Sequence, residues 1–203
     1  MMQRLTHLKE SPSQTAGPYV HIGCVPNACG ISGVYDSDLG SNMVNEQTKG
    51  ERITVTGAVF DGTGTPLRDA LVEIWQADAD GLYANGDPRG SGDPDFAGWG
   101  RAAADHDTGV WTFETIRPGV VPFPDGRRMA PHISFWIVAR GINIGLQTRM
   151  YFPNDPMLAD DPWLTRIEHQ NRVHTLIAKE KTPTTFQFDI HLQGPDETVF
   201  FDV

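Results

Sequence analysis

Two side chains in the segment MAPHISF, residues 129–135, have the spacing of a metal site, but only one of them is a good metal ligand. His132 and Ser134 are two residues apart in an apolar run, where strand periodicity places both side chains on the same face. A His-x-His pair in that setting can bind one ion with both imidazoles. Here the second imidazole is replaced by a hydroxyl, a poor ligand for a transition metal. The segment therefore resembles a metal site that has lost a ligand.

Two further stretches combine a constrained backbone with groups that could contact a ligand. In TAGPYVHIG, residues 15–23, Gly17 and Pro18 fix a turn, and the missing side chain at Gly17 lets another group approach the backbone. In ARGINIG, residues 139–145, Arg140 follows the most apolar run of the chain. From the residues alone, Arg140 is either the partner of a surface carboxylate or a group that binds an anion.

Three other groups have simpler explanations. Cys24 and Cys29 lie in a loop rich in Gly, Asn and Pro, where a disulfide or half of a metal site is the alternative to reduced thiols. Because the sequence has no second cysteine pair, we favour two reduced thiols in a cytoplasmic protein. Tyr83 could offer a phenolate to a metal, but its position between a strand and a loop favours packing.

Composition limits the class of protein. The 203 residues suffice for one domain with a substantial core. The net charge of −10, without a cluster of Lys and Arg, argues against binding to nucleic acid or to an anionic membrane surface. No leader or membrane-spanning segment is visible, so we expect a cytoplasmic location.

The remaining sequence, which must position these groups, reads as short strands joined by turns. The 21 glycines and 15 prolines suit many turns better than long helices. One helix is expected over residues 161–179, with Asp161 as its N-cap and Pro162 at its first position. The alternating or apolar runs that predict strands are residues 52–60, 71–77, 110–116, 132–139, 146–152 and 184–190.

This pattern predicts an all-β fold, a β-sandwich with one or two short helices, over residues 51–203. Residues 1–50 are polar, loop-like and rich in Pro and Gly, so we expect an N-terminal arm that packs on another surface, that of a partner chain.

Long stretches rich in Trp, Gly and Pro resemble the intradiol ring-cleaving dioxygenases. The resemblance implies the β-sandwich fold of that family and is weakest over residues 24–51 and 84–93. The matching stretches are SPSQTAGPYVHIG (11–23), VEIWQADADGLY (72–83), DFAGWGRAA (95–103), RPGVVPF (117–123), MAPHISFWIVARGINIGLQTRMYF (129–152), TLIAK (175–179) and GPDETVFFDV (194–203).

The resemblance also implies what the metal site has lost. Family members hold Fe(III) with two tyrosinates and two histidines, because hard phenolates stabilise the ferric ion. Val121 stands at one tyrosine position, Ser134 at one histidine position and Met129 at a neighbouring arginine, while the loop 84–92 matched to the other tyrosine has none. We therefore expect this chain to bind no metal, and His132 to be a core histidine hydrogen-bonded within its sheet.

Two-chain members of the family supply the functional hypothesis. The resemblance is closest to their non-iron-binding alpha chain, which implies a homologous beta chain that holds Fe(III) and a higher-order αβ oligomer. The implied reaction cleaves 3,4-dihydroxybenzoate with O2 to 3-carboxy-cis,cis-muconate. The substrate-binding residues carried over to this chain are Thr15, Ala16, Gly17, Pro18 and Arg140. The alternative is a non-catalytic β-sandwich that binds or scaffolds other molecules and descends from a dioxygenase.

Overall fold

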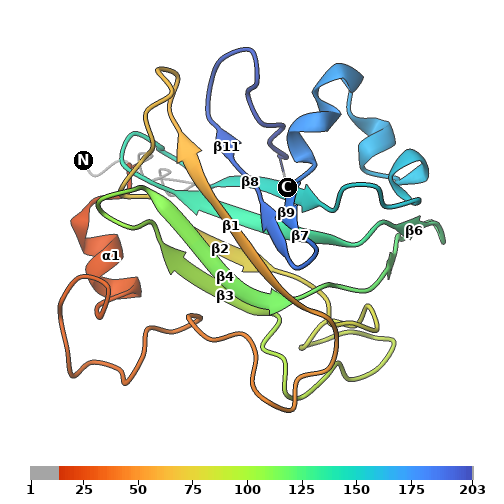
Figure 1. Cartoon of the computed structure of the whole chain (residues 1–203), viewed down its shortest axis with the longest axis horizontal. Coiled ribbons are helices and arrows are strands. Elements are labelled where there is room, and N and C mark those ends of the chain that lie inside the picture. The colour runs from red at the N-terminus through yellow and green to blue at the C-terminus, as the bar shows by residue number, and fades with distance from the viewer. Residues whose placement is uncertain (1–13, 203) are drawn as a thin grey trace, which may run out of the picture.

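Two antiparallel-rich sheets form the fold in the computed structural model, which describes residues 14–202 (Figure 1). Residues 1–13 of the expected arm lie outside this range. In the first sheet the order is β11-β1-β10-β9, with β4 paired to β1, and in the second it is β3-β2-β7-β8. The strands of the first sheet are β1 (Arg52–Phe60), β4 (Val110–Ile116), β9 (Lys179–Thr182), β10 (Thr185–Gln187) and β11 (Ile190–His191). Those of the second are β2 (Leu71–Trp75), β3 (Trp99–Ala103), β7 (His132–Val138) and β8 (Leu146–Tyr151), and β5 (Val121–Pro122) pairs with β6 (Arg128–Met129) in a small ribbon.

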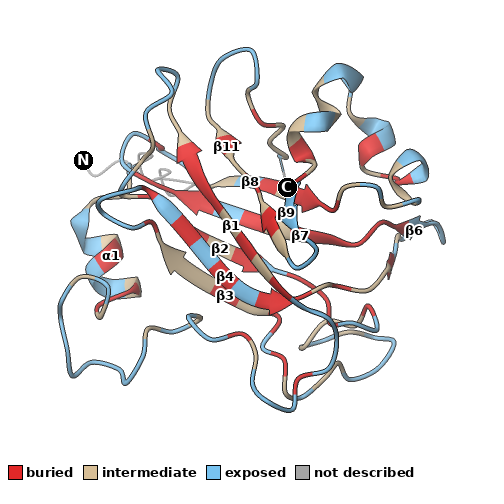
Figure 2. Ribbon diagram, viewed as in Figure 1, coloured by how far each residue is buried: buried red, intermediate tan, exposed pale blue. Residues whose placement is uncertain are grey.

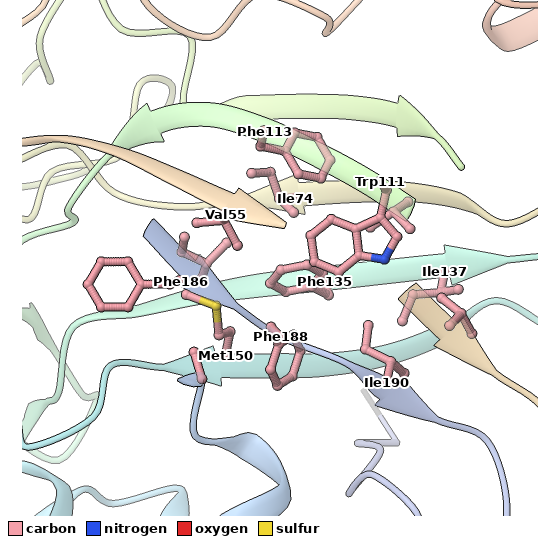
Figure 3. Packing of buried hydrophobic residues seen from close by; sticks show 14 of the residues in the cluster. Val55, Ile74, Trp111, Phe113, Phe135, Ile137, Met150, Phe186, Phe188 and Ile190 are labelled. Carbon is pink, nitrogen blue, oxygen red and sulfur yellow. The ribbon is translucent and has the colours of Figure 1, made fainter. Parts of the chain in front are cut away.

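Alternating side chains turn one face of each sheet inward. In β4, residues 110, 112 and 114 are exposed, whereas Trp111, Phe113 and Thr115 are buried (Figure 2). The inward residues of both sheets meet in one aromatic-rich cluster (Figure 3). There the Trp111 ring lies 5.4 Å from that of Phe135, and the Phe135 ring 5.2 Å from that of Phe188. This packing confirms the predicted all-β sandwich.

Part of the N-terminal arm packs on the second sheet of this same chain. A short helix that the sequence did not predict, α1 (Pro18–Cys24), begins at Pro18, where the missing N–H costs no helical hydrogen bond. Ala16, Val20 and Cys24 pack with Leu71 and Val138 in a small apolar cluster. The arm therefore brings residues 15–18 to the end of β7.

The helix predicted over residues 161–179 is wrong. The chain instead forms three 3-10 segments, η1 (Leu158–Asp160), η2 (Leu164–Arg166) and η3 (Gln170–Leu176), and enters β9 at residue 179. Asp161 does cap a turn, because its Oδ1 accepts hydrogen bonds from the backbone N–H groups of Trp163 (2.8 Å) and Leu164 (3.0 Å). A continuous α-helix does not follow, because the Leu164 carbonyl accepts a 3-10 hydrogen bond from the Ile167 N–H (3.3 Å) and a second one from Gln170 Nε2 (2.9 Å).

Among residues 14–202, no helix has the length and apolar character needed to cross a bilayer.

Gly57 provides a test of how closely the strands pack. A Cβ at this position would lie 2.0 Å from the Phe188 carbonyl oxygen, which is backbone and cannot move aside cheaply. We expect Gly57→Ala to lower the free energy of unfolding by about 1–3 kcal/mol, measured by urea unfolding. Gly23→Ala is the matched control, because nothing lies within 4 Å of the point that a Cβ would occupy there. Equal stability of the two variants would contradict the close packing.

Candidate functional site

The five residues expected to bind substrate come together at one open hollow. Its volume is about 900 Å³, and its lining includes Thr15, Ala16, Gly17, Pro18 and Arg140. The first four immediately precede or begin α1, and Arg140 follows β7. The arm and the strand end are more than a hundred residues apart in sequence, so only the fold joins them.

Thr15 fastens the arm to the loop after β7. Its Oγ1 accepts a hydrogen bond from the Gly141 backbone N–H at 2.7 Å and lies 3.4 Å from the Ala139 carbonyl oxygen, to which it can donate. Gly141 has φ +90°, a conformation that a residue with a side chain rarely adopts. The Thr15 hydroxyl and this glycine together fix the turn that carries Arg140.

The sequence left open whether Arg140 pairs with a surface carboxylate. The structure has such a pair, yet most of the Arg140 guanidinium stays free. Asp69 Oδ2 lies 3.7 Å from Arg140 Nε and accepts a hydrogen bond from the Arg140 backbone N–H at 3.3 Å. The Arg140 side chain is 83% exposed, so the ion pair is weak and largely screened by solvent. The structure therefore presents an exposed cation in the lining of the hollow.

Sequence reasoning missed several polar residues of the hollow, among them two histidines and an aspartate. His21, Asp69 and His106 line it, and they come from α1, the turn before β2 and the turn before β4. His21 is buried, and burial is the main cause that lowers its pKa. Its Nε2 has no hydrogen-bond partner among the described residues. His21 stood within a run already singled out, whereas nothing in the sequence connects Asp69 or His106 to it.

The degenerate metal position lies at the opposite end of β7. His132 is buried, as predicted, but its Nδ1 lies 2.8 Å from the carbonyl oxygen of Ala130, which precedes β7, so this contact is not within the sheet as expected. Val121 is buried with Ala77 and Met129. Ser134 is half-buried and lies on the same face of β7 as His132, as strand periodicity predicted.

Tyr83 lies closer to this position than the sequence suggested. It packs against the cluster of Ala77, Val121 and Met129, and its ring stacks on that of Trp75 at 6.1 Å and 14°. Tyr83 and Val121 also line a shared hollow of about 520 Å³. Packing therefore accounts for Tyr83, as expected, and it places the ring against Val121, one of the altered ligand positions.

The residues at this position do not fit a ferric ion. A valine and a hydroxyl stand where the family has a phenolate and an imidazole, and His132 Nδ1 is engaged with the backbone. Within residues 14–202, no group of three or more His, Cys, Asp or Glu side chains could hold a metal. Cys24 and Cys29 are separate free thiols.

The environment of His132 predicts a pH dependence of stability. Its pKa is lowered to about 4, first by burial and then by the positive charge of Arg149. An unfolded histidine titrates near about 6.5, so between these values the unfolded chain binds a proton that the folded chain does not. Stability is therefore fully present above about pH 6.5 and falls as the pH drops toward about 4, by up to about 3 kcal/mol.

We expect urea unfolding at several pH values between about 7 and 4.5 to show this loss, and His132→Asn to reduce its slope. His21, whose pKa is also lowered, titrates in both proteins and leaves a residual slope. An unchanged slope in His132→Asn would show that His132 binds a proton as readily in the folded chain as in the unfolded chain.

Comparison with known proteins gives the family. A family model described as Dioxygenase matches residues 30–194. The chain is similar to the protocatechuate 3,4-dioxygenase alpha chain of Pseudomonas putida, with 44% identity over 199 residues that cover 96% of this chain and 97% of the relative. It is also 40% identical over 179 residues to the protocatechuate 3,4-dioxygenase beta chain of Burkholderia cepacia, covering 82% of this chain and 75% of the relative.

Solved structures support the fold. Catechol 1,2-dioxygenase from Acinetobacter matches with a TM-score of 0.58 and 22% identity, covering 77% of this chain and 61% of that one. A dioxygenase domain from Streptomyces matches with a TM-score of 0.57 and 24% identity, covering 93% of this chain and all of that one. The chain belongs to the intradiol dioxygenase family.

Proposed function

We propose that this chain is the alpha subunit of a protocatechuate 3,4-dioxygenase and supplies one wall of a substrate pocket that a homologous beta chain completes. The beta chain holds Fe(III). The assembly cleaves 3,4-dihydroxybenzoate with O2 to 3-carboxy-cis,cis-muconate, in the cytoplasm. The carbon–carbon bond between the two hydroxylated carbons breaks and both oxygen atoms enter the product, so no further oxidant or reductant is needed.

One observation carries the proposal: the hollow and the degenerate metal position lie at opposite ends of β7. Arg140 comes eight residues after His132, and the strand runs from His132 to Val138. At about 3.3 Å per residue, the strand alone separates the two positions by roughly 20 Å. A substrate at Arg140 is therefore out of reach of a metal at His132, even if the ligands were intact. An iron that serves this hollow has to come from another chain.

The surface around the hollow supports a partner. Binding pockets bury most of a small ligand, whereas this hollow is open. Tyr19, beside Pro18, is 87% exposed, and Ile144, in the loop after Arg140, is 67% exposed. Large apolar side chains at that level of exposure favour an interface. The similarity to both an alpha and a beta chain of one enzyme favours a homologous partner.

Arg140 and the Thr15–Pro18 turn have different tasks in this pocket. The substrate carries a carboxylate and reacts as a catecholate, so it is an anion. The Arg140 guanidinium is a cation and lowers the free energy of that anion. The turn at Thr15–Pro18 contributes backbone and small side chains, which exclude water and limit how the ring can lie.

Removal of the Arg140 charge tests the task proposed for this side chain in the pocket. A charge-assisted hydrogen bond is worth roughly 1.5–3 kcal/mol, so we expect Arg140→Ala to lower kcat/KM by about ten- to a hundredfold in the co-purified αβ assembly. Iron content and assembly should not change, because the side chain is exposed and weakly paired. Steady-state oxygen consumption and metal analysis provide the measurements.

Arg127→Ala is the matched control, because Arg127 is also an exposed arginine paired to one carboxylate, Asp125, but does not line the hollow. Full activity in Arg140→Ala would make Arg140 a structural residue. So would a loss of activity that follows dissociation of the oligomer.

The second test concerns the chain without its partner. Expressed alone, it should contain no ferric iron, lack the visible tyrosinate-to-iron absorption band, and aggregate or self-assemble because its apolar interface is uncovered. Expressed with the beta chain, it should co-purify with iron and ring-cleaving activity. A well-behaved, iron-free monomer with a sharp thermal transition and no such partner would favour the scaffold protein instead.

A further inference from the structure

A guanidinium stands at the degenerate metal position of this chain. Arg149 lies on β8 directly opposite Ser134 of β7, in the register of the second sheet. Its Nη1 lies 3.7 Å from the sulfur of Met129, whose strand partner is Val121. Arg149 thus lies beside the strand that carries Ser134 and contacts the strand that pairs with Val121. It is also close enough to His132 and Tyr83 for its charge to act on both.

Aromatic faces hold this cation in place of a carboxylate. The Arg149 Cζ lies 4.5 Å from the centre of the Trp163 ring and 5.9 Å from that of Phe201. Residues 14–202 form six salt bridges, and Arg149 takes part in none of them. The cation is half-buried, so stacking on aromatic rings compensates for part of the water it has lost.

The ring beneath Arg149 is itself fixed by a buried carboxylate. Asp161 is fully buried, and its Oδ1 accepts the Trp163 backbone N–H at 2.8 Å. Its Oδ2 accepts the Ala130 N–H at 2.8 Å, next to the segment that carries His132. The 3-10 turns therefore hold Trp163 against the sheet, and Trp163 in turn holds the guanidinium over the former metal position.

We infer that Arg149 takes the place of the metal cation in this chain and excludes a metal from the site by its fixed positive charge. A multivalent cation at a few ångströms from a half-buried guanidinium is repelled in an environment with less screening than water. The loss of ligands at Val121 and Ser134 is then only part of the change. Restoring those ligands does not restore metal binding while Arg149 is present. The inference rests on the proposed function, in which the iron of the assembly belongs to the beta chain.

The test restores the ligands with and without the charge. Val121→Tyr and Ser134→His are combined in the αβ assembly with Arg149 kept, with Arg149→Lys, or with Arg149→Gln. In the Gln protein the two new side chains join His132 and Tyr83, and we expect about one additional ferric ion per αβ pair, with a stronger visible absorption band. The Arg149 and Lys proteins keep the iron content of the wild type, because Lys retains the charge.

Two results would overturn the inference: an additional ferric ion in the protein that retains Arg149, or none in a correctly assembled Gln protein. A wild-type assembly that already holds about two ferric ions per pair would instead refute the proposed function.

A second test with fewer substitutions does not depend on correct folding of the triple variants. Ser134→His alone creates a His-x-His pair with His132, a two-ligand edge suited to Zn²⁺. Zn²⁺ should raise the Tm of Ser134→His/Arg149→Gln and leave that of Ser134→His unchanged. An equal rise in both proteins would show that the guanidinium excludes nothing.

Discussion

The two faces and two ends of β7 (His132–Val138) determine where chemistry can occur in this protein. The inner face carries Ile133, Phe135 and Ile137, which are buried in the core between the sheets. A slip of one residue would expose these side chains, so hydrophobic packing fixes the register of the strand. The same register places His132 and Ser134 together on the outer face, and it fixes where the chain leaves the sheet toward Arg140. The core therefore positions both the degenerate metal site and the hollow, although neither belongs to it.

The two ends of β7 carry cations in opposite environments. Arg149 is half-buried and stacked on aromatic rings beside the metal position, where it makes the site unsuitable for a metal. Arg140 is exposed and weakly paired at the hollow, where it can meet an anion. His132 remains neutral at physiological pH because burial and the nearby guanidinium both lower its pKa. A chain with this arrangement suits the role of a partner in catalysis better than that of a self-sufficient metalloenzyme.

The sequence predicted the strands that have clear periodicity. The bounds of β1 and β4 agree with the predicted residues 52–60 and 110–116, because apolar and polar side chains alternate there. β3, with the sequence Trp-Gly-Arg-Ala-Ala, was missed since it has no such alternation and pairs with β2 through its backbone. The stretch predicted as residues 184–190 divides into β10 and β11, which both pair with β1 in parallel. Long-range contacts explain the other misses. The helix α1 depends on Leu71 and Val138, and the contact of Thr15 with Gly141 spans 126 positions. An arginine in a strand, such as Arg149, has no signature in the sequence until its neighbours are known. The residues themselves indicated the Gly17–Pro18 turn and Arg140, and the family resemblance assigned all five residues at the hollow to substrate binding.

The most direct test of the proposed division of labour is a structure of the co-purified assembly with 3,4-dihydroxybenzoate bound under anaerobic conditions. We predict that the substrate and the partner's iron lie at the hollow, with the ring in van der Waals contact, within about 4 Å, of the Thr15–Pro18 turn and of Arg140. We also predict the Arg149 guanidinium, and no metal, beside His132. An iron bound beside His132 would contradict this division, as would a hollow that faces solvent far from any metal.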